Sequence, residues 1–235
     1  QDALALGEFF RKMRIPDFQR ETDYVCLSKD GAYAIYDGDI VSSDGSRLPV
    51  EKFENNFHEL QRQNEVIKKV EHDGKSYMIG AIARINNGRN KLNPKAHQYL
   101  ESLNFIFPDY NPFHNILAQM VEVIHSIEES AKIAKELLNA DLGNVITQPY
   151  EIKEGVGVAA VEAPRGTLYY HVEVDGKGYI KNVNIITPTA QFLANLEDDV
   201  AEYIKQIIDL DDKAKQSKLR GFIRAYDPCI SCAVH

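Results

Sequence analysis

The chain ends in the stretch Asp227-Pro-Cys-Ile-Ser-Cys-Ala-Val-His235, which constrains fold and function more than any other part of the sequence. Three potential metal ligands lie in it, Cys229, Cys232 and His235, spaced i, i+3 and i+6. On a helical or tight-turn backbone such positions lie near one face and can converge on one small volume. Pro228 lacks a backbone N–H and fixes its own φ, so it ends the helix expected before it and directs the cysteines away.

A Cys-x-x-Cys pair alone suits a zinc half-site, an iron–sulfur ligand pair, a redox dithiol or no site at all. A structural zinc site needs four protein ligands, and Cys26 is the only further thiol in the sequence. A thioredoxin-like dithiol normally lies at the N-terminus of a helix, whereas only three residues follow Cys232. Two buried cysteines in a packed tail are the alternative without a site.

Composition indicates an ordinary folded protein. Of 235 residues, 44% are hydrophobic and 26% charged, which excludes a disordered or collagen-like chain. The formal net charge of −8 argues against nucleic acid as a partner. An odd number of cysteines disfavours a disulfide framework. We find no run of about 18 apolar residues and no secretory signature, so we expect a cytoplasmic protein without a membrane span.

The first third of the chain predicts a helix and small antiparallel sheets. The helix is expected over residues 1–14, before Pro16. Asp-Gly turns separate short β-prone runs that predict an antiparallel meander over 24–28, 32–36 and 39–42. A short helix should open at residues 49–52. A further strand pair is expected over 66–70 and 76–85.

The clearest helix begins after Asn111-Pro112 and runs to about Asn139. Apolar residues recur in it at three- and four-residue spacing and predict core packing: Leu117, Met120, Val121, Ile124, Ile127, Ala131, Ala134 and Leu138. Strands are predicted over 156–162, 167–174 and 179–187, and helices over 197–210 and 213–226. The predicted fold class is α+β, a long-helix bundle carrying the site, with peripheral small antiparallel sheets.

The terminal stretch resembles the signature of nickel-iron hydrogenase large subunits, Asp-Pro-Cys-x-x-Cys-x-x-His. Two inner segments, Glu162-Ala-Pro-Arg-Gly166 and Ile186-Thr-Pro-Thr-Ala-Gln191, are similar to internal motifs of that family and follow in the expected order. Residues 23–43 and 108–138 are also similar to its cytoplasmic, cofactor-linked branch. The resemblance therefore runs through nearly the whole chain and implies the fold of that large subunit.

The resemblance implies an organisation for the chain. Residues 1–235 would be the C-terminal portion of one large-subunit domain, with a peripheral β-rich region at 23–85. Residues 111–235 would hold the helices, the second sheet and the metal-binding tail. We expect the N-terminal half to be absent from this chain, because the family needs a second Cys-x-x-Cys and two functional glutamates that nothing here supplies. Cys26 has no partner cysteine, and we expect it to be a buried core thiol.

The resemblance also implies metal ligands. Cys229 matches a terminal nickel ligand, and Cys232 matches the thiolate that bridges nickel to an iron carrying carbon monoxide and cyanide. His235 matches the ligand of a nearby magnesium or second iron, and the backbone carbonyl of Ile185 matches a further magnesium ligand. Thiolates are soft donors that suit nickel and iron.

Cofactor contacts follow in the same way. Arg165, together with Pro164, falls beside the open side of the metal pair, and Thr189 falls where a hydroxyl donates to a cyanide. Cys229, Arg165 and Asp227 are the candidate catalytic groups, and Asp227 is expected to orient Arg165. The sequence departs from the family at Phe192, where Asn is usual.

The implied activity is reversible heterolytic oxidation of dihydrogen, with electrons passed to an iron–sulfur small subunit, since three cysteines are too few for a cluster as well. Further electron-transfer subunits, the N-terminal half as a separate chain, a maturation protease and chaperones are the other implied partners. A non-catalytic relative that has lost the metal cysteines is an alternative against which Cys229 and Cys232 argue. The second alternative is a maturation-stage or split subunit, which binds metal but needs another chain for activity.

Overall fold

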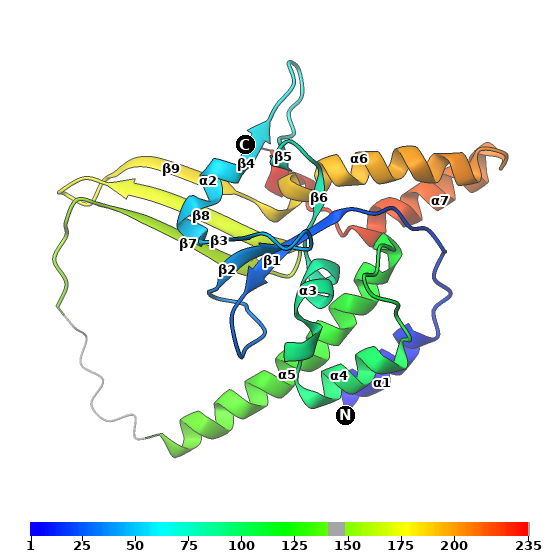
Figure 1. The fold of residues 1–235 in the computed structure, drawn as a ribbon, viewed down its shortest axis with the longest axis horizontal. Helices are drawn as coiled ribbons and strands as arrows, with labels where there is room; N and C mark the ends of the chain where they lie inside the picture. The colour runs from blue at the N-terminus through cyan, green and yellow to red at the C-terminus, as the bar shows by residue number, and fades with distance from the viewer. Residues whose placement is uncertain (141–148, 235) are drawn as a thin grey trace.

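Two groups of helices and three small sheets make up residues 1–140 and 149–234, which the computed structural model describes (Figure 1). In the first group, α1 (Asp2–Arg11), α3 (Ala81–Gly88) and α4 (Pro94–Ser102) pack on α5 (Asn115–Asn139). The second group is the pair α6 (Pro188–Ile207) and α7 (Asp212–Ala225). The α+β fold class is therefore confirmed.

Helix α5 is the long helix expected from the apolar spacing. It follows the short helix η3 (Pro112–His114), where the Asn111 side chain accepts a hydrogen bond from Phe113 N at 3.0 Å. Its first turns bury the predicted stripe, but Ile127 is 53% and Leu138 85% exposed. The prediction of core packing is wrong for the second half, because α5 there extends beyond the neighbouring helices (Figure 1).

The first sheet has the strand order β3-β2-β1-β6. Strands β1 (Asp23–Ser28), β2 (Asp39–Ser42) and β3 (Arg47–Leu48) pair antiparallel, whereas β6 (Tyr77–Met78) joins β1 parallel. The strand predicted at 32–36 is wrong. That segment turns inward instead, and the hydroxyl of its Tyr33 donates to Glu122 on α5 at 2.7 Å.

The second strand pair also differs from the prediction. Strand β5 (Lys69–His72) pairs antiparallel with β4 (Phe57–Leu60). Strand β4 follows the short helix η1 (Val50–Lys52), which was expected at 49–52, and a second short helix, α2 (Phe53–Asn56). Most of the run at 76–85 is not strand, because helix α3 begins at Ala81. That helix is buried over most of its length, and a buried helix cannot be told from a buried strand by periodicity.

The third sheet matches its prediction. Strands β7 (Gly155–Ala163), β8 (Gly166–Val174) and β9 (Ile180–Ile186) form an antiparallel meander on one side of the molecule (Figure 1). The hairpin between β7 and β8 turns at Pro164 and Arg165. Helix α6 begins at Pro188, nine residues earlier than predicted, because proline suits the first position of a helix.

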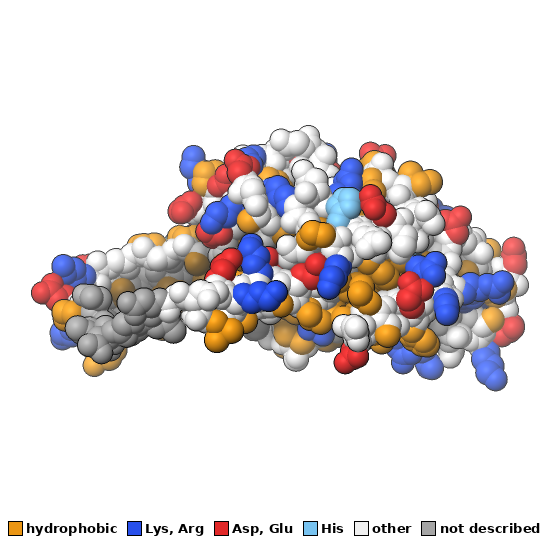
Figure 2. Space-filling model, turned by 90° about the horizontal axis from the view of Figure 1, so that it is seen from below, with side chains coloured by type: hydrophobic (Ala, Val, Ile, Leu, Met, Phe, Trp, Pro, Cys, Tyr) orange, Lys and Arg blue, Asp and Glu red, His pale blue; other side chains and the backbone are white. Residues whose placement is uncertain are grey.

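Charges of both signs cover the surface. On the face in Figure 2, Lys and Arg side chains alternate with Asp and Glu, and hydrophobic side chains lie between them. Neither sign forms a continuous patch on that face. In the described parts of the chain, the structure contains no helix with the length and apolar character needed to cross a membrane.

Candidate metal centre

Residues 227–234, here called the cysteine tail, leave the end of α7 through a sharp turn. Tyr226 still has helical backbone angles, but Asp227 has a φ of 52° and its N–H donates to Arg224 O at 3.0 Å. A left-handed residue just past the last turn is a common way to end a helix. Pro228 follows directly, so the tail departs where the sequence predicted.

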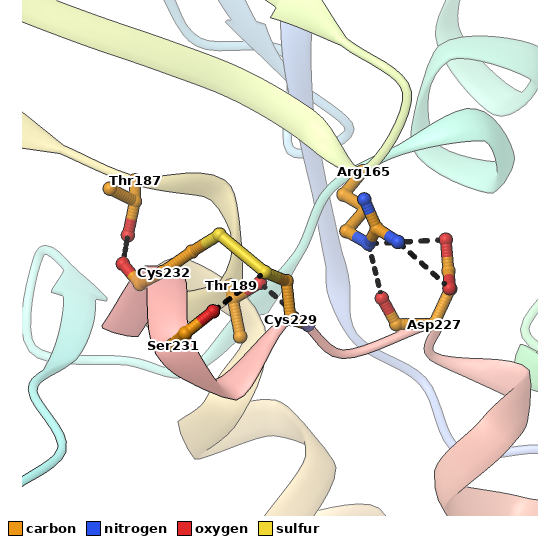
Figure 3. The surroundings of a disulfide bond; sticks show 7 residues. All are labelled: Arg165, Thr187, Thr189, Asp227, Cys229, Ser231 and Cys232. Carbon is orange, nitrogen blue, oxygen red and sulfur yellow. Dashed lines mark hydrogen bonds and ion pairs between the residues drawn. A yellow bond between two sulfur atoms is a disulfide. The ribbon is translucent and has the colours of Figure 1, made fainter. Parts of the chain in front are cut away.

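The tail brings its two cysteines together. Residues Ile230–Ala233 form a 3-10 turn, η4, and Cys232 N donates to Cys229 O at 2.9 Å. The Cα atoms of Cys229 and Cys232 are 5.4 Å apart, and their sulfurs are joined as a disulfide (Figure 3). Both cysteines are half-buried. Because both sulfurs lie at one point, the reduced pair can bind one metal without a rearrangement of the backbone. His235, the third predicted ligand, lies outside the described residues.

Four contacts hold residues 229–234 of the tail on their surroundings. Thr189, which is 1% exposed near the start of α6, accepts a hydrogen bond from Cys229 N at 3.2 Å. Thr187 donates to Cys232 O at 2.6 Å (Figure 3). Further along, Lys68 N donates to Ala233 O, and Val234 forms a β-bridge with Ile67. Thr189 therefore lies beside Cys229.

Arg165 faces Asp227 across the gap between the β7–β8 hairpin and the tail. Arg165 Nε donates to the Asp227 carbonyl oxygen at 2.6 Å, and Nη2 donates to Asp227 Oδ1 at 3.2 Å (Figure 3). Gln119 on α5 donates to Asp227 Oδ2 at 3.4 Å. The two charged side chains are 40% and 42% exposed, so the pair lies at the surface. Pro164, next to Arg165, is also exposed.

The other predicted positions lie around this arrangement. Ile185 is the residue before the last of β9, and β9 leads directly into Thr187. Phe192, the departure from the family motif, is 1% exposed and packs against Tyr226 with the ring centroids 5.6 Å apart. Its ring thus supports the residue before Asp227.

Cys26 is buried, as predicted, and burial raises the pKa of its thiol well above the usual value.

Sequence reasoning missed a group of buried charges behind the hairpin. Arg84 on α3 contacts Glu122 on α5 and Glu162 on β7, and all three side chains are at most 14% exposed. Burial lowers the pKa of Arg84, but the two carboxylates outweigh it and raise that pKa well above normal. An arginine within the apolar run 77–85 was the available signal, because arginine is seldom fully buried without a partner.

The residues present fit part of a metal centre. Two soft sulfur ligands meet at the surface beside a guanidinium and a buried hydroxyl, which suits nickel or iron better than magnesium or calcium. Over residues 1–140 and 149–234, no three His, Cys, Asp or Glu side chains come together as a metal site would require. A four-ligand zinc site is therefore not formed by these residues, and any metal bound here needs further donors.

Comparison with known proteins places the chain in a family. Residues 27–235 match the family described as nickel-dependent hydrogenase. The alpha chain of sulfhydrogenase 1 from Pyrococcus furiosus is 37% identical over 244 residues, covering 100% of this chain and 56% of that protein. A vhc F420-non-reducing hydrogenase protein of Methanococcus voltae is 30% identical over 233 residues, covering 92% and 49%.

A solved structure has the same fold. The crystal structure of an NAD+-reducing NiFe-hydrogenase in the H2-reduced state superposes with a TM-score of 0.72 at 25% identity, covering 93% of this chain and 51% of that one. The chain thus spans about half the length of the relatives that it matches. On the family match and these identities, the chain belongs to the nickel-dependent hydrogenase family.

Proposed function

We propose that residues 1–235 are the C-terminal portion of the catalytic large subunit of a nickel-iron hydrogenase. The overall reaction is the reversible conversion of dihydrogen into two protons and two electrons. The observation that carries the proposal is the meeting of Cys229 and Cys232 beside the Arg165–Asp227 pair, in a chain that belongs to this family. The β-rich region at 23–85 and the part at 111–235 belong to one domain in this proposal.

Cys229 and Cys232 would hold the nickel-iron centre, Cys229 as a ligand of nickel and Cys232 as a ligand of both metals. A thiolate sulfur is a soft donor and can bridge two metals. His235 and the backbone carbonyl of Ile185 are the proposed ligands of a magnesium or second iron. When bound, the nickel-iron centre, with carbon monoxide and cyanide on the iron, supplies an electrophilic metal that polarises dihydrogen.

Arg165 provides a fixed cation beside the metal ligands. Its two hydrogen bonds to Asp227 hold the guanidinium at the tail. A planar set of N–H donors in a fixed position stabilises anionic ligands and negative charge that develops during a reaction. The Thr189 hydroxyl accepts from Cys229 N, so its own hydrogen can donate to an anionic ligand. The exposed Pro164 is the proposed apolar contact beside them.

Proton transfer is assigned to Cys229. A thiolate next to the metal is basic enough to accept one proton at Sγ, and the half-buried position of Cys229 lets that proton pass on to solvent. Asp227 holds Arg165 in place through this transfer. The two electrons pass to a partner subunit, because this chain has no thiol left to bind an iron–sulfur cluster. Cys229 and Cys232 are the proposed metal ligands, and Cys26 is buried in the core.

The proposed partners include an iron–sulfur small subunit, together with further electron-transfer subunits. The other partners are a polypeptide that supplies the remaining thiolates, a maturation protease and chaperones. A cytoplasmic location is part of the proposal and rests on the resemblance to the cytoplasmic branch.

The test compares cysteine variants of the complete subunit purified with its partners. We expect nickel, iron, infrared bands of carbon monoxide and cyanide, and dihydrogen-dependent dye reduction in the wild type. Cys229→Ser and Cys232→Ser should each lose nickel and activity. Cys26→Ala is the matched control and should keep both, at a stability cost of about 1 kcal/mol. A wild-type complex without nickel and without those bands refutes the proposal. Full metal content without activity would favour the maturation-stage alternative instead.

A further inference from the structure

The buried charges behind the β7–β8 hairpin form one connected group. Arg84 Nε and Nη2 donate to Glu122 Oε1 and Oε2 at 2.6 and 2.7 Å, and Arg84 Nη1 donates to Glu162 Oε2 at 2.6 Å. The Arg84 side chain is 4% exposed and that of Glu162 is 0% exposed. Glu162 Oε1 also accepts from Leu27 N and Thr167 Oγ1, at 2.7 and 2.8 Å. Buried charges with this many partners have one arrangement, because any other leaves a charge unpaired.

Arg84 also holds the backbone of the hairpin tip. Nη1 donates to Ala163 O and Nη2 donates to Pro164 O, both at 3.1 Å. These carbonyls belong to the two residues before Arg165. The five N–H donors of a guanidinium lie in one rigid plane, so the same side chain can bind two carboxylates and two carbonyls in a fixed relation. The tip is thereby tied to α3 and α5.

The residues before α3 also contact the tip closely. Gly80 has a φ of +87°, and a Cβ built on it would lie 3.0 Å from Arg165 O. Gly166 has a φ of +136°, and a Cβ there would lie 2.2 Å from Ile79 Cδ1. Both positions need glycine, because both have a positive φ and a Cβ would meet the Arg165 carbonyl at Gly80 and the Ile79 side chain at Gly166. The start of α3 therefore contacts the tip twice, through the guanidinium of Arg84 and through Gly80.

Helix α5 connects the tip to the tail. Glu122, which orients Arg84, lies three residues after Gln119, which donates to Asp227 Oδ2. Residues three apart lie on the same face of a helix. One face of α5 thus contacts Asp227 directly and, through Arg84, the carbonyls of the two residues before Arg165.

We propose that Arg84 is a positioning residue that fixes the 163–166 tip, and through it the guanidinium of Arg165, against the cysteine tail. The inference rests on the proposed function for its catalytic consequence, but the hold on the tip is a property of the chain itself. Arg84 does not touch the reacting groups. It acts by setting where Arg165 is, because a fixed cation stabilises developing charge better than a mobile one.

The test uses the complete subunit in its complex, with Arg84→Lys as the main variant. Lysine keeps the charge but cannot reach both carboxylates and both carbonyls. We expect amide hydrogen exchange in residues 163–167 to rise about tenfold, with exchange in α6 unchanged. We expect the dihydrogen-dependent rate to fall about a hundredfold while nickel and iron content stay at the wild-type level. Arg89→Lys, the same change in the helix η2 (Arg89–Lys91) after α3, is the control and should alter neither.

A double-variant comparison separates positioning from general damage. If Arg84 acts through Arg165, Arg84→Lys in an Arg165→Lys background should reduce the rate by less than about twofold further. Equal losses in both backgrounds would overturn the inference, as would unchanged exchange at the tip. If Arg84→Lys does not fold, Gly80→Ala replaces it as the test. This variant places a Cβ against Arg165 O and keeps all charges, so the inference requires that it raise amide exchange at the tip. If the wild-type complex lacks metal, the proposed function fails while the exchange measurement still decides whether Arg84 holds the tip.

Discussion

The hairpin tip at 163–166 and the cysteine tail at 227–234 meet at the same site but are held in different ways. The tip is fixed by buried charges, by close contacts at Gly80 and Gly166 and by strands on both sides. Beyond Asp227, the tail is held mainly by three hydrogen bonds and one isolated bridge, and both of its cysteines are half-buried. Few buried contacts mean a low free energy of local opening.

This difference suits a site that is assembled in two steps. The guanidinium of Arg165 can be held in its final position before any metal binds, because the side chain itself undergoes no reaction. In the proposed function the two cysteines are reduced and then bind metal, and a tail with few contacts can open for these steps without unfolding the domain. The following predictions alter one side of the comparison at a time.

Arg84→Met should have the largest effect on stability. It leaves Glu122 and Glu162 close together without their cation, in a position with little access to water. Loss of one partner from a buried ion pair costs about 3–5 kcal/mol. Denaturant unfolding of the complete subunit measures this loss. Lys29→Met, which removes a cation from an exposed pair with Asp37, should cost under about 1 kcal/mol. Equal costs for the two variants would show that the buried charges do not fix the tip.

Gly166→Ala should displace the tip without touching a charge. The left-handed backbone and the overlap with Ile79 together predict a cost of about 2–3 kcal/mol. Gly157→Ala on β7 is a matched control, because a Cβ there has nothing within 4 Å. The control should change the free energy of unfolding by less than about 0.5 kcal/mol. If Gly166→Ala is equally mild, the tip can give way and the contrast with the tail is smaller than we infer.

The part of the site that the sequence predicted is the part with local motifs. The cysteines, Pro228, Arg165 and Thr189 lie in short segments whose residue types restrict the backbone, and the structure brings them together. The second and third strands of the β7–β9 sheet were predictable because Asp175-Gly176 separates them at close range. Turn residues of this kind restrict the backbone locally, so their effect does not depend on the tertiary contacts of the rest of the chain.

Long-range contacts could not be predicted in this way. Arg84 lies 38 residues from Glu122 and 78 from Glu162, and nothing in the run around it says which carboxylates it meets. The same holds for β4 and β5, whose pairing depends on Phe57 and Val70 sharing one core. The periodicity of apolar residues indicates which face of a segment is buried, but it does not identify the segment against which that face packs.

Thr189→Val should loosen the tail and leave the tip unchanged. It removes the acceptor of the Cys229 N–H, and one such hydrogen bond contributes about 1 kcal/mol. In the reduced subunit we expect Cys229 to react with an alkylating reagent about fivefold faster. Thr22→Val, which removes a hydroxyl hydrogen bond to Asn195, is the control and should leave that rate unchanged. An unchanged alkylation rate in Thr189→Val would show that the hydrogen bonds from Thr187 and Lys68, and not the one to Thr189, keep the tail closed.

Glu54→Gln should have the smallest effect, and only above acidic pH. Burial raises the pKa of Glu54, but hydrogen bonds from Asn184 and His171 outweigh it and lower that pKa below its usual value. A lowered pKa in the folded state means stability that is present above about pH 4.3, the usual value for glutamate, and is lost as the pH falls through the folded pKa.

Because the side chain is 39% exposed, solvent screening should keep this contribution of Glu54 under about 1 kcal/mol. Melting temperatures of wild type and Glu54→Gln should therefore differ at pH 6 and converge below about pH 4. Glu51→Gln, at an exposed position in η1, should show no such convergence. Glu54 contacts β8 and β9 through His171 and Asn184, away from the tip. At either pH, the variant should therefore exchange at residues 163–167 at the same rate as the wild type. A change there would mean that the sheet as a whole, and not Arg84, sets the position of Arg165.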